Sequence, residues 1–179
     1  LMGLVMVGIF AFSRDGALGA GQLLVTHGLV YAMLFAAAAG LRDRKGHLDI
    51  ERWGGLFRQA PVFATLLSLA LLAAWGMPGL AIFPGAALVL SGAMAGQPVA
   101  AMAGAAGLLL AAAWSSRVIL RICLGEPANA LGEVPAARGR ELGVLVPLAV
   151  VLLALGTYPR LLADVFGPAL VELVRVVGG

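Results

Sequence analysis

The sequence predicts an all-α integral membrane protein: a polytopic bundle of about four to five transmembrane helices, one of them discontinuous. Two observations carry this prediction. The residues are 61% hydrophobic and 12% charged, with a mean hydropathy of +1.01, whereas soluble domains carry about 25% charged residues. The apolar runs are long and do not alternate with polar positions, which argues against a β-barrel. We expect one transmembrane domain over residues 1–179, in contact with the lipid bilayer.

The charged residues and the cysteine content exclude several classes of function. The net charge of +3 is modest, and the basic residues fall mostly in loops. These residues therefore indicate the topology of the protein in the membrane, and no nucleic-acid partner is expected. The single cysteine, Cys123, excludes an internal disulfide and a cysteine metal cluster. No metal-ligand spacing occurs, and we predict no metal site.

The first half of the chain contains a short apolar run, a complete span and a polar loop. Leu1–Phe12 is shorter than the roughly 20 residues needed to cross a bilayer, and we interpret it as a helix without its N-terminal half. Ala17–Leu41 is the first complete span. Residues 42–60 form a polar loop that is too charged for lipid. Its Trp53 and Phe57 suit an interfacial segment, and a solvated connector is an equally good interpretation.

The apolar run Pro61–Met94 is the element around which the prediction is built. As one straight helix it would measure about 50 Å, longer than a hydrocarbon core of about 30 Å. It is interrupted at Gly76-Met77-Pro78-Gly79 and again at Pro84-Gly85. A proline kink and a helix broken beside an ion pathway both explain these residues. The length favours a break at Gly76–Gly79.

The second half adds two spans and fixes the expected orientation. Val99–Leu124 and Glu141–Tyr158 are apolar, and the tail 161–179 is either a short surface helix or frayed. The loops 42–60 and 125–140 share one side of the membrane. They hold seven basic residues: Arg42, Arg44, Lys45, Arg52, Arg58, Arg138 and Arg140. The turns on the other side hold Arg14. The basic side, with its polar loop 42–60, is therefore expected to be cytoplasmic.

Few polar side chains lie at membrane depth, and these are the candidate functional residues. His27 is the strongest, because imidazole both gives and takes a proton near neutral pH. Gln22 and Thr26 on the same helix could support a water chain leading to it. A neutral His27 bonded to a neighbouring carbonyl is an equally good interpretation. Arg117 and Arg121 form an i, i+4 pair that either serves the pathway or extends to the lipid headgroups.

Several stretches, in order, resemble the antiporter-like subunits of bacterial NADH–quinone oxidoreductase (respiratory complex I), and among these the subunit M branch. The stretches are MGLVMVGIFAF (2–12), THGLVYAMLF (26–35), DIERWGGL (49–56), GMPGLAIFPG (76–85), LGE (124–126) and RELGVLVPLAVVLLALGTYP (140–159). Together they cover nearly the whole chain, although GMPG alone is a weak signal.

The resemblance implies a fold, a place in it and a function. The family fold is a long helical bundle with inverted repeats, each with a broken helix, and this chain would be about its C-terminal third. Residue His27 would belong to a hydrated polar axis that carries protons. The subunit would bind no cofactor itself. Its partners would be other membrane subunits of the complex, in the bacterial inner membrane.

Two departures from the family pattern leave the function open. Where the resemblance implies a protonatable Glu after the break, this chain has Ala86, and where it implies a His before Met2 it has Leu1. Arg117 occupies a position that is usually uncharged. Three functions therefore compete: a proton-translocating subunit, a structural paralogue that does not pump, and a subunit of a multi-subunit cation/proton antiporter.

Overall fold

The computed structural model describes residues 1–126, 134–165 and 167, and within these ranges every regular element is helical. The residues 168–179 of the predicted tail lie outside the described part, while residues 160–165 and 167 are helical. The elements, in order, are α1 (Met2–Phe10), α2 (Arg14–Lys45), η1 (Ile50–Arg52), α3 (Leu56–Gln59), α4 (Pro61–Ala74), α5 (Ile82–Met94), α6 (Pro98–Val118), η2 (Ile119–Leu124) and α7 (Gly139–Thr157).

The helices form a membrane bundle. In the described residues three helical segments are long and apolar enough to cross a bilayer: α2, the continuous run Pro98–Leu124, and α7. The apolar helices α4 and α5 are shorter. This confirms the predicted all-α membrane fold with several spans.

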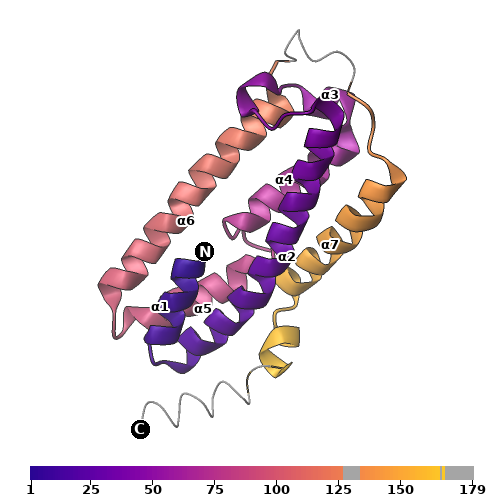
Figure 1. Ribbon diagram of the computed structural model, residues 1–179. Helices are drawn as coiled ribbons and strands as arrows, with labels where there is room; N and C mark the ends of the chain where they lie inside the picture. Colours follow the sequence, from indigo (N-terminus) through magenta and orange to yellow (C-terminus); the bar gives the residue numbers. More distant parts are fainter. Residues whose placement is uncertain (127–133, 166, 168–179) are drawn as a thin grey trace.

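Helix α2 is the central element, and it packs against α1, α4, α5 and α7 (Figure 1). Its ends are well specified. Ser13 caps the N-terminus by accepting a hydrogen bond from the Gly16 N–H at 3.1 Å. Gly46, at a φ of 73°, ends the helix with its N–H on the Arg42 carbonyl oxygen. The predicted span ended at Leu41, so the first residues of the polar loop are in fact helical.

The apolar run from Pro61 to Met94 is divided into α4 and α5, and local sequence explains the interruption. Gly76, at a φ of 84°, directs its N–H to the Ala73 carbonyl, while the Met77 N–H reaches the Leu72 carbonyl. This pair of bonds is a Schellman cap. A turn with Pro78 second and Gly79 third follows, closed by Leu80 N–H on the Met77 carbonyl. With Gly79 at a φ of 88°, it has the type II pattern.

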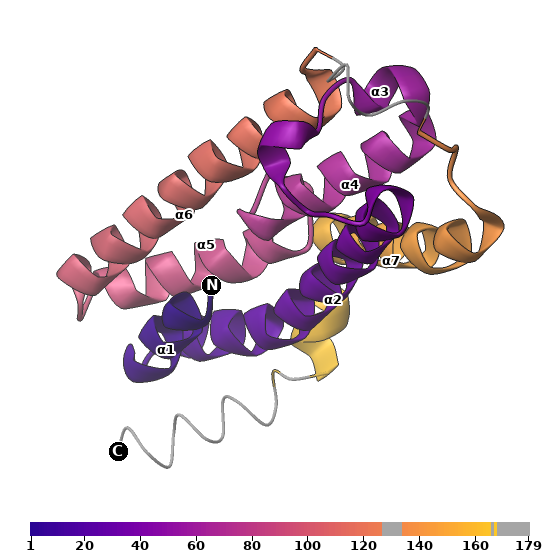
Figure 2. The ribbon, with the colours of Figure 1, turned by 45° about the horizontal axis from the view of Figure 1, so that its top comes forward.

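The two halves contact different parts of α2. Phe63 of α4 lies beside Gly40, near the C-terminal end of α2, and Gly85 of α5 lies beside Gly19, near its N-terminal end. In Figure 2 the two helices follow one another across the bundle, with α6 alongside. That α4 and α5 together make one discontinuous membrane-spanning helix stays a prediction.

The polar loop 42–60 does not behave as a uniformly solvated connector. Trp53, Leu56 and Ala60 are each only 1% exposed, whereas Arg52 and Arg58 are exposed. The Gln59 side-chain oxygen accepts a hydrogen bond from the Val134 N–H at 2.7 Å. The loop therefore folds back onto the bundle and packs there through its apolar residues.

The loops and turns gather at the two ends of the molecule as the sequence predicts. At one end, the loop 42–60 meets residues 134–136 (Figure 1). At the other end, Gln97 donates from its side-chain amide to the Phe10 carbonyl oxygen at 2.6 Å. This contact joins the turn between α5 and α6 to the turn between α1 and α2.

Candidate functional site

The predicted polar residues of α2 divide between two sides of the helix. Gln22 is 3% exposed and Thr26 is 1% exposed, and one helical turn separates them, so they share a buried face. The Thr26 hydroxyl donates to the Gln22 carbonyl oxygen at 2.8 Å, and the Gln22 amide approaches the Pro159 carbonyl oxygen at 3.5 Å. The Thr26 hydroxyl is thus bonded within α2, while the Gln22 side chain reaches the residue that follows α7 and its cap.

His27 points to another side of α2, since it is rotated by about 100° from Thr26. It is half-buried, and its ring lies 4.3 Å from the ring of Tyr31, centroid to centroid. Its Nδ1 atom is buried and has no hydrogen-bond partner among the described residues. The structure therefore places His27 next to Tyr31, with its Nδ1 atom enclosed and unpaired among the described residues.

The helix break is contacted by α7, and α5 beyond it is contacted by α2, although residues 77–79 themselves are exposed. Gly156 of α7 lies so close to Gly79 and Leu80 that a side chain on it would collide with their backbone. Gly85 contacts the Gln22 side chain, since a Cβ on Gly85 would lie 3.2 Å from the Gln22 Cβ. Pro84 is in the first turn of α5, where its missing N–H is tolerated. The break and Gln22 are therefore neighbours.

Ala86 follows directly after this contact and is 3% exposed. The position that the resemblance assigns to a protonatable Glu is therefore inside the protein and carries a methyl group. A methyl group neither binds nor releases a proton. The neighbouring Gln22 of α2 can form hydrogen bonds, but its side chain does not titrate.

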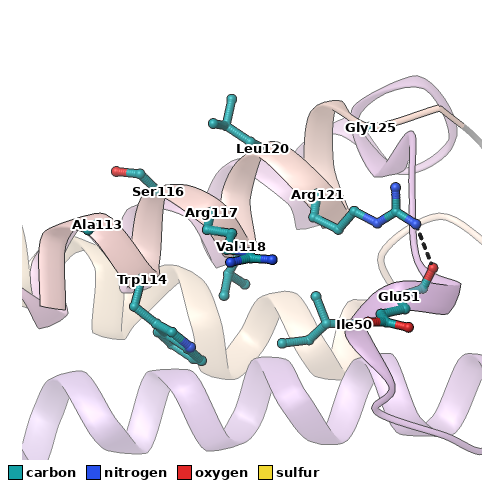
Figure 3. A pocket seen from close by; sticks show the side chains of 10 residues that line it. All are labelled: Ile50, Glu51, Ala113, Trp114, Ser116, Arg117, Val118, Leu120, Arg121 and Gly125. Carbon is teal, nitrogen blue, oxygen red and sulfur yellow. Dashed lines mark hydrogen bonds between the residues drawn. The ribbon is translucent and has the colours of Figure 1, made fainter. Parts of the chain in front are cut away.

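Arg117 is remote from this buried face. It is exposed on α6 and lines a groove of about 790 Å³ with Trp114, Arg121, Ile50 and Glu51 (Figure 3). A second, mostly apolar cavity of about 450 Å³ adjoins the groove, because Trp114, Ile50 and Val118 line both. Tyr31 lines this second cavity. Tyr31, but not His27, therefore lies at a cavity that adjoins the groove at Arg117.

The structure also brings together a charged pair that the sequence analysis did not single out. Arg44, whose side chain is 2% exposed, forms a two-pronged ion pair with Glu141, which is 14% exposed. The two bonds measure 2.6 and 2.7 Å. Arg44 also donates to the carbonyl oxygens of Gly40, Pro135 and Ala136. No spacing in the sequence links residues 97 positions apart. The only sequence signal for this ion pair was the acidic Glu141 at the start of an apolar span.

The described residues offer no evident metal centre, since no three His, Cys, Asp or Glu side chains lie together in them. What the arrangement supplies is a pair of polar side chains near a helix break and a half-buried imidazole whose Nδ1 atom has no partner among the described residues. These features suit the passage of a small ion or proton better than covalent catalysis.

Comparisons with known proteins give the family context. The chain is 32% identical over 176 residues to NADH-quinone oxidoreductase subunit M of Mycobacterium tuberculosis, covering 98% of this chain and 32% of that protein. A chain in the structure of respiratory complex I from Thermus thermophilus with bound NADH superimposes with a TM-score of 0.93 at 31% identity. That match covers 99% of this chain and 38% of the other.

A further likeness concerns the fold alone. A chain of the Mrp complex from Dietzia sp. superimposes with a TM-score of 0.82 at 22% identity, over 95% of this chain and 40% of that one. The present chain thus spans about a third of the length of the relatives it matches. The family model described as "NADH:quinone oxidoreductase/Mrp antiporter, TM" matches residues 1–111, more than half of the chain. This chain therefore belongs to the NADH:quinone oxidoreductase/Mrp antiporter transmembrane family.

Proposed function

We propose that the chain is part of a membrane subunit of a complex I-like NADH–quinone oxidoreductase and contributes to proton translocation. The observation that carries the proposal is the match along 99% of its length to a chain of respiratory complex I. Its relatives named subunit M support the same assignment. The proton would pass by His27. That Gln22 and Thr26 also take part stays a prediction, since they lie on another side of α2. The same holds for Arg117, which is exposed on α6.

The geometry supports a pathway role for His27 in particular. The imidazole is half-buried within a span, and its Nδ1 has no partner in the described chain. An imidazole ring can both accept and donate a proton. Gln22 and Thr26 bond to the backbone instead, so their role would be to hold the α2 face against the break.

The second candidate is a structural paralogue that packs in such a complex without pumping. Ala86 favours it, because the buried position beside the break holds no titratable group. The third candidate, a subunit of a multi-subunit cation/proton antiporter, is supported by the family description, which includes Mrp antiporters. Cation/proton antiport measured in the absence of quinone reductase subunits would identify this third candidate.

We further propose that the chain binds no flavin, iron–sulfur cluster or NADH, and that electron transfer takes place elsewhere in the complex. Its single cysteine supports this for the cluster, which uses about four thiolate ligands. The other membrane subunits of the complex would be its partners. The bacterial inner membrane would be its location, in keeping with its bacterial relatives.

Replacement of His27 by alanine tests the proton-pathway role. We expect His27→Ala to lower proton pumping while the complex still assembles, because the substitution removes the titratable ring at membrane depth. Pumping is measured in vesicles that contain the reconstituted complex, relative to its electron-transfer rate.

The matched control is Phe35→Ala, which removes another ring from α2 at a position that is 72% exposed. Pumping should be unchanged in that variant. If His27→Ala pumps as well as the original protein, His27 is not in the pathway. If the original protein does not pump protons either, the structural paralogue is the better assignment.

A further inference from the structure

The buried side of α7 ends in a residue without a side chain. Leu145, Ala149 and Leu152 are the buried residues of this helix. Their spacing of four and then three positions places them on one side of it. The next position of the series, four residues further on, is Gly156. The helix therefore presents bare backbone to the bundle at the place where another apolar side chain would continue the series.

The turn of the helix break occupies the space in front of Gly156. A Cβ on Gly156 would meet the carbonyl oxygen of Gly79, and it would lie 2.5 Å from both the carbonyl carbon and the Cα atom of Leu80. All three are backbone atoms, which cannot rotate away as the end of a side chain can. Since carbon atoms in contact are normally about 3.5–4.0 Å apart, a methyl group here would separate α7 and the turn by about 1 Å.

Of these two elements, α7 is attached to α2 on both sides of Gly156. Near its start, Glu141 forms the buried ion pair with Arg44. Just after its end, the Pro159 carbonyl oxygen is approached by the Gln22 amide at 3.5 Å. The turn is an irregular segment between two helices, closed by the Leu80 N–H on the Met77 carbonyl oxygen. We therefore expect a methyl group on α7 to displace the turn and leave the helix in place.

We propose that Gly156 is a positioning residue for the helix break: its bare backbone sets how closely the turn at Gly79 and Leu80 lies against the bundle. The turn leads directly into α5, which begins at Ile82 and brings Gly85 against the Gln22 side chain. A shift of the turn is therefore passed on to the polar face of α2. The effect on proton translocation rests on the proposed function, whereas the effect on the position of the turn does not.

The variant Gly156→Ala, in the assembled complex with the full subunit, tests the position of the turn. Electron cryo-microscopy should show the Leu80 Cα atom about 1 Å farther from α7 than in the original complex. Gly143→Ala is the matched control, because Gly143 lies in the same helix and a Cβ on it would meet nothing within 4 Å. It should leave the turn in place. Alanine is the better helix former at both positions, so helix propensity cannot explain a loss in Gly156→Ala alone.

The second readout is the ratio of protons pumped to electrons transferred, measured in vesicles that contain the complex. We expect Gly156→Ala to lower this ratio and Gly143→Ala to keep it. A purely structural role of Gly156 would lower the amount of assembled complex instead, and the ratio in the assembled fraction would not change.

A turn that keeps its position in Gly156→Ala overturns the proposal, as does an unchanged ratio in a complex that pumps. If the original complex pumps no protons, the proposed function fails, and the position of Leu80 alone decides for or against Gly156. If Gly156→Ala does not assemble, hydrogen exchange in the original complex decides. The Leu80 N–H should then exchange as slowly as the amide hydrogens of α4 and α5, and exchange as fast as in an unfolded peptide overturns the proposal.

Discussion

Arg44 is a charged side chain that the fold has removed almost completely from solvent. Its guanidinium is held by Glu141, by three backbone carbonyl oxygens and by the ring of Phe63, whose centroid lies 4.3 Å from its Cζ. These groups belong to α2, α4, α7 and the segment before α7. A charge costs free energy to bury unless it is fully paired, so this one contact fixes the relative positions of several elements at the basic end.

Replacing Arg44 by glutamine should destabilise the protein by about 3 kcal/mol, because Glu141, which is only 14% exposed, is left without its charged partner. The free energy of unfolding is measured in mixed detergent micelles. The exposed pair of Arg52 and Asp49, 70% and 48% exposed, provides the control. Arg52→Gln should cost at most about 0.5 kcal/mol.

A change that removes both charges of the buried pair sharpens this test. Arg44→Met combined with Glu141→Leu should cost less than Arg44→Gln alone, since no charge is then left unpaired. If Arg44→Gln costs no more than Arg52→Gln, the pair does not hold the helix ends together.

The candidate site shows what sequence reasoning delivers for single residues. His27, Gln22 and Thr26 were identifiable because polar side chains within an apolar run are few. The contacts of these residues could not be identified from the sequence. The sequence indicates which side of a helix a residue lies on, but the neighbouring helices decide what that side contacts. Thus Gln22 lies beside Gly85 and Pro159, and His27 lies beside Tyr31. The Arg44–Glu141 pair had no local signature at all.

At the scale of the element, the interruption between α4 and α5 is explained by the four residues Gly76-Met77-Pro78-Gly79. Gly76 ends α4 in the left-handed conformation, and Pro78 and Gly79 shape the turn that follows. These roles depend on backbone conformations that only a few residue types adopt easily. The sequence was therefore a good guide to the place of the interruption.

Gly79→Ala tests the conformational requirement of the turn. A Cβ on Gly79 would meet nothing within 4 Å, so the cost comes from its φ of 88° alone. That conformation costs an alanine roughly 1–2 kcal/mol. Gly28→Ala is the matched control, since Gly28 also has open space around it but lies inside α2.

The two variants should differ in sign. Gly28→Ala should stabilise the protein by about 0.5–1 kcal/mol, because alanine is the better helix former. Both values come from the same unfolding measurement in micelles. Equal effects of the two substitutions would show that Gly79 is not held in the left-handed conformation.

Only some of the glycines of α2 serve close helix packing. Glycines in a membrane helix allow backbones to approach, and Gly19 does so: a Cβ there would lie 2.6 Å from the Gly85 carbonyl oxygen. Gly28, in the same helix, contacts no other element within 4 Å of a Cβ. Composition identified the glycines, and the placement of α5 decided which of them serve the interface.

At the scale of the whole molecule, the loops lie at two ends that differ in basic residues (Figure 1). The basic end holds Arg58, which is exposed, and the opposite end holds Gly96, also exposed. The excess of Lys and Arg in loops sets orientation in a membrane. The end with Arg58 should therefore face the cytoplasm.

Cysteine labelling measures this orientation. Arg58→Cys and Gly96→Cys are made in a Cys123→Ala background, which removes the single, buried native thiol. In intact cells, a thiol reagent that does not cross membranes should label the cysteine at position 96 and not the one at position 58. The reverse pattern would show that the basic end faces outward.

The sequence by itself determined the membrane class, the order of the spans, the position of the helix break and the residues with polar side chains at depth. These follow from composition, run length and the conformational demands of glycine and proline, which are local properties. The tertiary structure decided the rest: the burial of Trp53, the pairing of Arg44 with Glu141, and the separation of Arg117 from Gln22. Such contacts join residues far apart in the chain, and only the packing of whole helices sets them.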